Sequence, residues 1–128
     1  MSLSPSPLAK NILLVESEPL LLKFLRGILA RAGFQVLAAN NAEDALRIAQ
    51  GFPGPIDLLL TGCWMPRLTG PALAEELTQR PGLRVMLMSG EPAFATVAVK
   101  HRWGFIEKPF WPWALLDSVH FALSPHME

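Results

Sequence analysis

The sequence predicts an α/β protein with a doubly wound, five-stranded parallel sheet flanked by five helices. Two observations lead to this fold class. Short apolar runs alternate along the chain with segments whose apolar residues recur at helical spacing, an order typical of parallel sheets covered by helices. The length of 128 residues fits a single domain of common size with one substantial core. We therefore expect one α/β domain.

Five short apolar runs mark the expected strands. Their residues are apolar at nearly every position, not at alternate positions, which is typical of parallel strands buried on both faces. In chain order, the strands are expected over residues 10–16, 34–38, 56–61, 83–88 and 105–106. Such strands need helices on both sides of the sheet to cover them.

A helix is expected after each strand. Most of these segments begin near a capping or proline residue, and their apolar residues recur at helical spacing. The helices are expected between Ser17 and Gly33, between Asn41 and Gly51, from Thr69 to before Pro81, from Pro92 to about Lys100, and through Leu115 to Leu123. Ser17 and Asn41 are the predicted N-caps of the first two helices.

Charge and composition exclude several classes of function. Eleven Lys and Arg balance eleven Asp and Glu, and no basic cluster is present, so nucleic-acid binding is not expected. No apolar run reaches the roughly 18 residues that a transmembrane helix needs, so no membrane partner is expected. A single cysteine, Cys63, cannot form an internal disulfide, and no signal-peptide pattern is present. A cytoplasmic location is the expectation.

The two ends of the chain differ from its middle. Residues 1–9 are rich in Ser and Pro and are expected to form a flexible lead. Residues 124–128 are expected to form a short tail, and the domain itself is predicted over 10–123. Such ends fit either a small protein that stands alone or a domain of a larger one.

Polar side chains gather where the predicted strands end. Glu16 and Ser17 follow the first strand, Gly62 the third, Ser89 the fourth and Lys108 the fifth. In doubly wound sheets, the ligand site lies beyond the carboxyl ends of the strands, where the strand order reverses. These five residues therefore form the candidate site.

Four short motifs follow the predicted strands. They are an acidic residue after the first strand, Thr-x-x-Trp-Met-Pro over residues 61–66, Ser-Gly after the fourth strand and Lys-Pro-Phe after the fifth. In this order and at these intervals, they resemble the receiver domain of two-component response regulators over residues 10–123. The resemblance implies a flavodoxin-like fold with strand order 2-1-3-4-5.

The resemblance assigns a role to each residue of the candidate site. In that family, an acidic pair after the first strand and an aspartate after the third hold Mg²⁺. The aspartate accepts a phosphoryl group from a histidine kinase, and a Ser or Thr and a Lys contact it. Hard divalent ions prefer several oxygen ligands, and phosphoryl transfer depends on positioning and charge neutralisation. Carried onto this chain, the acidic pair is Glu16 and Ser17, the phosphoacceptor Gly62, the hydroxyl Ser89 and the cation Lys108.

Two of these positions depart from the family pattern. Gly62 has no side chain to phosphorylate, and Ser17 lacks the second carboxylate that would bind the metal directly. Glu16 and the backbone carbonyl of Trp64 alone would make a poor Mg²⁺ site. The expectation is a degenerate receiver, or pseudo-receiver, that accepts no phosphoryl group, binds Mg²⁺ weakly or not at all, has no other cofactor and is not an enzyme.

Each residue of the candidate site also has a structural interpretation. Glu16 and Lys108 are expected to pair, because a charge near the core without a partner is costly. Ser89 would cap the next helix or bind a strand-end amide, and Gly62 would serve a bulge or a close backbone approach. Cys63 is interpreted as a small, buried hydrophobic residue.

Aromatic residues near the last strand suggest a partner face. Phe105 occupies the position of the family's switch aromatic, and the Lys108–Pro109 bond is a cis candidate by the same resemblance. Trp103, Trp111 and Trp113 flank the last strand and open the last helix, a region that family members use for partners. Tryptophan is enriched among interface anchors, but it also packs in domain cores, so both interpretations stay open.

The sequence therefore predicts a signalling module that works through protein contacts. Its partner is expected to be a histidine kinase, an output domain or another receiver, with a homodimer as a further option. The alternative is a pocket at Lys108 and Ser89 that binds a small anion or metabolite. Asp57 is too far along its strand to replace the acceptor, and Thr61 alternates to the opposite face of the sheet.

Overall fold

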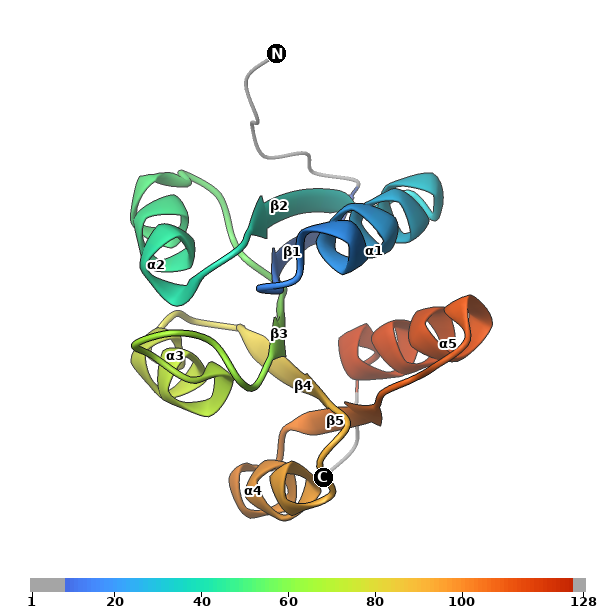
Figure 1. The fold of residues 1–128 in the computed structure, drawn as a ribbon. Helices are drawn as coiled ribbons and strands as arrows, with labels where there is room; N and C mark the ends of the chain where they lie inside the picture. Colours follow the sequence, from blue (N-terminus) through green and yellow to red (C-terminus); the bar gives the residue numbers. More distant parts are fainter. Residues whose placement is uncertain (1–8, 126–128) are drawn as a thin grey trace.

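The parallel sheet that the sequence predicts is present in the computed structural model, which describes residues 9–125 (Figure 1). Residues 1–8 and 126–128, which hold most of the predicted lead and tail, lie outside the described residues. Five parallel strands pair in the order β2-β1-β3-β4-β5, so the predicted strand order is confirmed. The strands are β1 Asn11–Val15, β2 Gln35–Ala39, β3 Leu58–Gly62, β4 Arg84–Ser89 and β5 Gly104–Glu107.

Five helices cover the two faces of the sheet. They are α1 Pro19–Arg31, α2 Ala42–Gly51, α3 Gly70–Leu77, α4 Ala93–His101 and α5 Pro112–Leu123. Helices α1 and α5 lie on one face, and α2, α3 and α4 lie on the other (Figure 1). No helix within residues 9–125 combines the length and the apolar character needed to cross a bilayer.

Side chains of the central strands alternate between two buried clusters. Leu13 and Leu59 belong to the cluster beneath α2, α3 and α4, whereas the next residues, Leu14 and Leu60, belong to the cluster beneath α1 and α5. All four are fully buried. Because helices cover both faces, successive positions of β1 and β3 must be apolar, and this produces the continuous runs seen in the sequence.

Two helix starts follow the expected capping chemistry. Asn41 accepts a hydrogen bond from the backbone N–H of Asp44 at the start of α2, as predicted. Thr69 accepts one from the N–H of Ala72 at the start of α3. Each bond satisfies an amide that has no partner inside its helix. These caps fix where the chain turns after β2 and after the loop that follows β3.

The prediction that Ser17 caps the first helix is wrong. Helix α1 begins at Pro19, and its N-cap is Glu18, whose side chain makes no capping bond. Proline suits the first helical position because its ring fixes φ and the missing N–H is not needed there. The backbone N–H of Glu18 instead donates to Oε2 of Glu16 at 3.1 Å. The carboxylate that follows β1 therefore binds the first turn of α1.

The ends of β3 and β4 are shifted from the predicted positions. Gly62 is the last residue of β3 and pairs in register with Met88, so it lies within the sheet. Ser89 is likewise the last residue of β4. Both residues are thus held by strand pairing at the carboxyl edge of the sheet.

The loop between β3 and α3 returns to touch the end of β3. The Gly70 N–H donates to the Cys63 carbonyl at 2.9 Å. A Cβ built on Gly70 would lie 2.0 Å from the Gly62 carbonyl oxygen, far inside the closest approach of real Cβ atoms. Gly62 therefore takes part in a close backbone approach, as suggested, but the position at which a side chain is excluded is Gly70. The contact joins a helix start to a strand end, so the sequence does not reveal the partner of Gly70.

Replacing Gly70 with Ala is expected to destabilise the domain by about 2–3 kcal/mol, because the new methyl group overlaps a backbone oxygen that cannot move without disturbing β3. Urea unfolding measures this loss. The matched control is Gly51→Ala at the end of α2, where a Cβ meets nothing within 4 Å. The control is expected to be neutral or to gain up to about 1 kcal/mol. Equal effects at the two positions would show that the contact at Gly70 is not tight.

Candidate functional site

The carboxyl edge of the sheet brings together four of the five predicted site residues. Glu16 follows β1, Gly62 ends β3, Ser89 ends β4, and Lys108 follows β5. The Lys108 backbone N–H donates to the Ser89 carbonyl at 2.9 Å, which continues the pairing of β4 and β5 by one residue. These four residues form what we call the edge cluster. The fifth residue, Ser17, is next to Glu16 in the chain but is not the cap of α1.

A buried ion pair lies at the centre of the edge cluster. Glu16 Oε1 accepts a hydrogen bond from Lys108 Nζ at 2.7 Å. The Glu16 side chain is only 4% exposed, and the Lys108 side chain is 29% exposed. A carboxylate this deeply buried stays charged at acceptable cost only when it is paired and hydrogen-bonded. The structural pair suggested by the sequence is therefore present.

The same carboxylate borders the space beside Gly62. A Cβ built on Gly62 would lie 3.1 Å from Glu16 Oε1 and 3.8 Å from the Val15 carbonyl oxygen. The backbone at Gly62 is not in the left-handed region, so its conformation does not require glycine. What limits a side chain at this position is the carboxylate of Glu16.

The edge cluster does not fit a Mg²⁺ ion. Glu16 is its one carboxylate, and both of its oxygens are engaged, Oε1 with Lys108 and Oε2 with the Glu18 N–H. No group of three or more His, Cys, Asp and Glu side chains that could hold a metal occurs among residues 9–125. Mg²⁺ prefers near-octahedral oxygen coordination and gives up its water reluctantly. One carboxylate already bound to an ammonium group does not provide such a site.

Comparison with known proteins places this chain in a family. The model of the response regulator receiver domain matches residues 12–120. The chain belongs to the response regulator receiver family. Its predicted resemblance is thereby confirmed at the level of the family, and the domain is one used in two-component signalling.

Relatives of this receiver domain occur in plants and bacteria. It is 30% identical over 121 residues to the putative two-component response regulator ARR21 of Arabidopsis thaliana, covering 93% of this chain and 20% of that protein. It is 36% identical over 91 residues to the response regulator receiver protein CpdR of Brucella abortus, covering 70% and 72%. The crystal structure of the receiver domain from the hybrid histidine kinase CckA superposes with a TM-score of 0.76 at 30% identity, covering 89% and 99%. The chain spans 11–22% of the first three curated relatives that it matches.

Ser89, a member of the edge cluster, and Cys63, which follows Gly62, both have structural environments. The Ser89 hydroxyl accepts the Glu91 N–H at 2.9 Å, so it stabilises the turn into α4, whose N-cap is a proline. Cys63 is 2% exposed. Burial raises the pKa of its thiol to about 11, against smaller opposing effects from Lys108 and Ser89. The interpretation of Cys63 as a buried, protonated thiol agrees with this position.

Two aromatic rings lie beside the edge cluster in an arrangement that the sequence did not predict. Trp64, two residues after Gly62, is 62% exposed. Its ring meets that of Phe94 in α4 edge to face, with centroids 5.1 Å apart, a favoured geometry for aromatic pairs. The pair links the β3–α3 loop to the first turn of α4. Because the two residues are distant in sequence, no local pattern reveals their contact.

The three tryptophans near β5 have different surroundings. Trp103 is partly buried against the core and stacks on His101 with ring centroids 4.1 Å apart. Trp111 and Trp113 are 71% and 65% exposed.

Phe105 is partly buried against the same core cluster as Trp103. The Lys108–Pro109 bond is cis, as the resemblance suggested.

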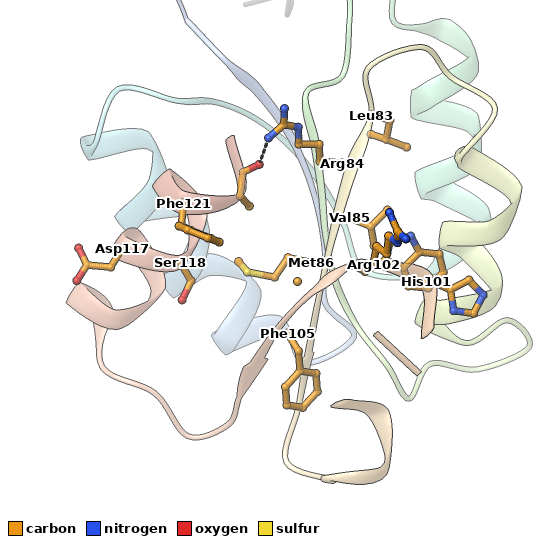
Figure 2. Close-up of a pocket in the computed structure, with 13 residues that line it drawn as sticks. Leu83, Arg84, Val85, Met86, His101, Arg102, Phe105, Asp117, Ser118 and Phe121 are labelled. Carbon is orange, nitrogen blue, oxygen red and sulfur yellow. Dashed lines mark hydrogen bonds between the residues drawn. The ribbon is translucent and has the colours of Figure 1, made fainter. Parts of the chain in front are cut away.

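A hollow of about 990 Å³ lies at the other end of β4 and β5 (Figure 2). It is bordered by Arg84 and Met86 of β4, by Phe105 and by Phe121 of α5, and it includes no residue of the edge cluster. The Arg84 guanidinium donates to the Ala122 carbonyl at 2.8 Å and thus binds the end of α5. The hollow is separate from the predicted site.

The buried thiol gives a prediction for pH dependence. The pKa of Cys63 is about 11 in the folded protein, against 9.0 ordinarily. Well below pH 9, the thiol keeps its proton in both the folded and the unfolded state. As pH rises from 9 towards 11, the unfolded state loses its proton first, so the free energy of unfolding is expected to fall. Urea unfolding at pH 8 and at pH 10.5 measures this fall in the wild-type protein and in Cys63→Ala. The difference between the two falls is the contribution of the thiol. Identical pH slopes in the two proteins would contradict the assignment.

Proposed function

We propose that this receiver domain accepts no phosphoryl group and acts in two-component signalling through protein–protein contacts. The observation that carries the proposal is at the edge cluster. Gly62, at the position matched to the phosphoacceptor, has no side chain, and the lysine expected to contact an acceptor is bound to Glu16 at 2.7 Å. Ser17 stands where a second metal-binding carboxylate would be needed. Acceptor and metal ligand are therefore missing together.

Neighbouring groups do not replace the acceptor. The Thr61 hydroxyl is fully buried and donates to the Gly62 carbonyl at 2.8 Å. The raised pKa of the Cys63 thiol keeps it protonated and weakly nucleophilic near neutral pH. Asp57 precedes β3 at its other end and accepts the Asn11 N–H at 2.7 Å. Each of these groups already has a structural environment that keeps it from serving as an acceptor.

A protein partner is better supported for this domain than a small ligand. Relatives of the chain include the sensor kinase CckA and several response regulators, so a histidine kinase, an output domain or another receiver is the proposed class of partner. Trp111 and Trp113 supply exposed aromatic surface of the kind that anchors interfaces. We place this activity in the cytoplasm, as expected for phosphorelay components.

Anion binding at the edge cluster is the weaker alternative. Lys108 would be the cation of such a site, but its ammonium group already holds the Glu16 carboxylate. An incoming anion would have to displace that buried carboxylate or lie beside it. Either way, the repulsion between the two negative charges is costly, and it grows in a poorly solvated site. No observation on the described residues favours this function.

Incubation with acetyl phosphate and Mg²⁺ tests the proposal directly. The intact mass of the protein is expected to stay unchanged, because position 62 offers no carboxylate to form an acyl phosphate. A receiver with an intact acceptor aspartate, treated in parallel, is expected to gain one phosphoryl group. A stable gain of one phosphoryl group by the present domain would refute the proposal.

Restoring the two missing carboxylates is expected to restore metal binding. Ser17→Asp combined with Gly62→Asp would place new oxygens beside Glu16, and a divalent ion would neutralise their mutual repulsion. Millimolar Mg²⁺ is expected to change tryptophan fluorescence, including that of Trp64, and raise Tm in the double variant while leaving the wild-type protein unchanged. No response in a folded double variant would mean that Gly62 does not mark the acceptor position.

A further inference from the structure

His101, the last residue of α4, has an oxygen atom close to each nitrogen of its ring. Nδ1 lies 3.0 Å from the carbonyl oxygen of Val97, one turn back in the same helix. Nε2 lies 3.1 Å from Oε1 of Glu75, which belongs to α3. The ring therefore bridges the end of α4 and the preceding helix, and we call these three residues the α3–α4 clasp.

The charge of the His101 ring decides whether both of its contacts are hydrogen bonds. A neutral imidazole carries a proton on only one nitrogen, so the other nitrogen would turn a lone pair towards an oxygen. The protonated ring donates from both nitrogens and also forms an ion pair with Glu75. Two oxygen acceptors around one ring are thus complementary to its charged form.

Two further surroundings of the ring favour a positive charge. His101 lies in the last turn of α4, where the free carbonyl groups form the negative end of the helix dipole. The indole of Trp103 stacks on His101 with ring centroids 4.1 Å apart and ring planes 19° apart. The face of an indole attracts a cation placed over it at such a distance.

Other charged residues near the clasp act in both directions. Those that neighbour its two titratable residues in the chain, or border the same hollow as His101 (Figure 2), are Glu76, Arg84, Lys100, Arg102 and Asp117. The acidic residues among them favour a proton on the ring, and the basic ones oppose it. All five are exposed, so solvent and salt weaken their effects. The carboxylate at hydrogen-bond distance is that of Glu75.

We propose that the α3–α4 clasp is a pH-sensitive device, which holds the end of α4 on α3 when His101 is protonated. Histidine is the side chain that ordinarily changes its charge between about pH 5 and pH 8. The clasp therefore tightens as pH falls through this range and loosens as pH rises. The inference does not rest on the proposed function, because it uses no residue of the edge cluster.

The proton on His101 also changes a surface of the domain. His101 and Trp103 border the hollow at the start of β5, away from the edge cluster. Protonation adds a positive charge to that border and, through Glu75, ties it to α3. A receiver with this clasp can respond to a proton at a position distant from the one matched to the phosphoacceptor.

A double-variant cycle at two pH values tests the clasp. The four proteins are wild type, Glu75→Gln, His101→Gln and the variant with both changes. Tm is measured for each at about pH 5.5, where histidine is mostly protonated and glutamate mostly ionised, and at about pH 8, where histidine is neutral. Both positions are exposed, so all four proteins are expected to fold.

At the lower pH, Glu75→Gln is expected to lower Tm by roughly 1–3 °C in the wild-type background. The loss is small because the pair is partly exposed to solvent. It is expected to be clearly less in the His101→Gln background, where the ion pair is already absent. At the higher pH, the two losses are expected to be nearly equal. Equal losses at the lower pH, or a difference that persists unchanged at the higher pH, would overturn the inference.

Hydrogen exchange shows whether the clasp controls the helix itself. Protection factors of the amides in the last turn of α4 are expected to be about two-fold higher at the lower pH in the wild-type protein, and equal at both pH values in His101→Gln. His120→Gln is the matched control, since this histidine lies in α5 beside the ring of Phe34. A pH effect that survives in His101→Gln, or that His120→Gln removes, would also overturn the inference.

Discussion

The ion pair between Glu16 and Lys108 is the interaction on which the site end of this receiver domain depends. It connects residues 92 positions apart in sequence, and it does so at the carboxyl edge of the sheet. Hydrophobic burial on both faces positions the strands, but it does not determine what happens at their polar ends. A buried carboxylate has strict requirements there, because its charge must be met by both a cation and hydrogen bonds. The Glu16 carboxylate meets these requirements by binding the Glu18 N–H, just before α1, and the Lys108 ammonium group, just after β5.

The sequence was sufficient for the fold because the fold rests on regular patterns. Continuous apolar runs such as Ile12 to Val15 follow from two-sided burial, and helical spacing follows from one-sided burial. Strand order came from the family resemblance, not from periodicity. The Glu16–Lys108 contact was also within reach, because the carboxyl ends of parallel strands meet at one edge and opposite charges there must pair.

What the sequence could not predict depends on contacts between distant segments or on competition between local signals. Ser17 looked like an N-cap, but Pro19 is the stronger signal and moves the cap to Glu18. The overlap that requires glycine at position 70 involves the carbonyl of Gly62 across a loop. The Trp64–Phe94 pair joins the loop after β3 to the helix after β4, two segments that are far apart in sequence. A glycine opening a helix directly after a good N-cap was the one available hint for Gly70, since glycine is a poor helix former.

The contact at Gly70 also has a consequence for Trp64. The Gly70 N–H binds the Cys63 carbonyl, and its Cα lies against the end of β3, so the segment between them, which carries Trp64, is closed into a ring. Closer approach of this ring to the sheet is blocked at Gly70, where even a Cβ would overlap the Gly62 carbonyl oxygen, and the Trp64 side chain on the ring is 62% exposed. A partner that binds this edge of the domain would contact an exposed tryptophan on a loop that is closed by a backbone hydrogen bond.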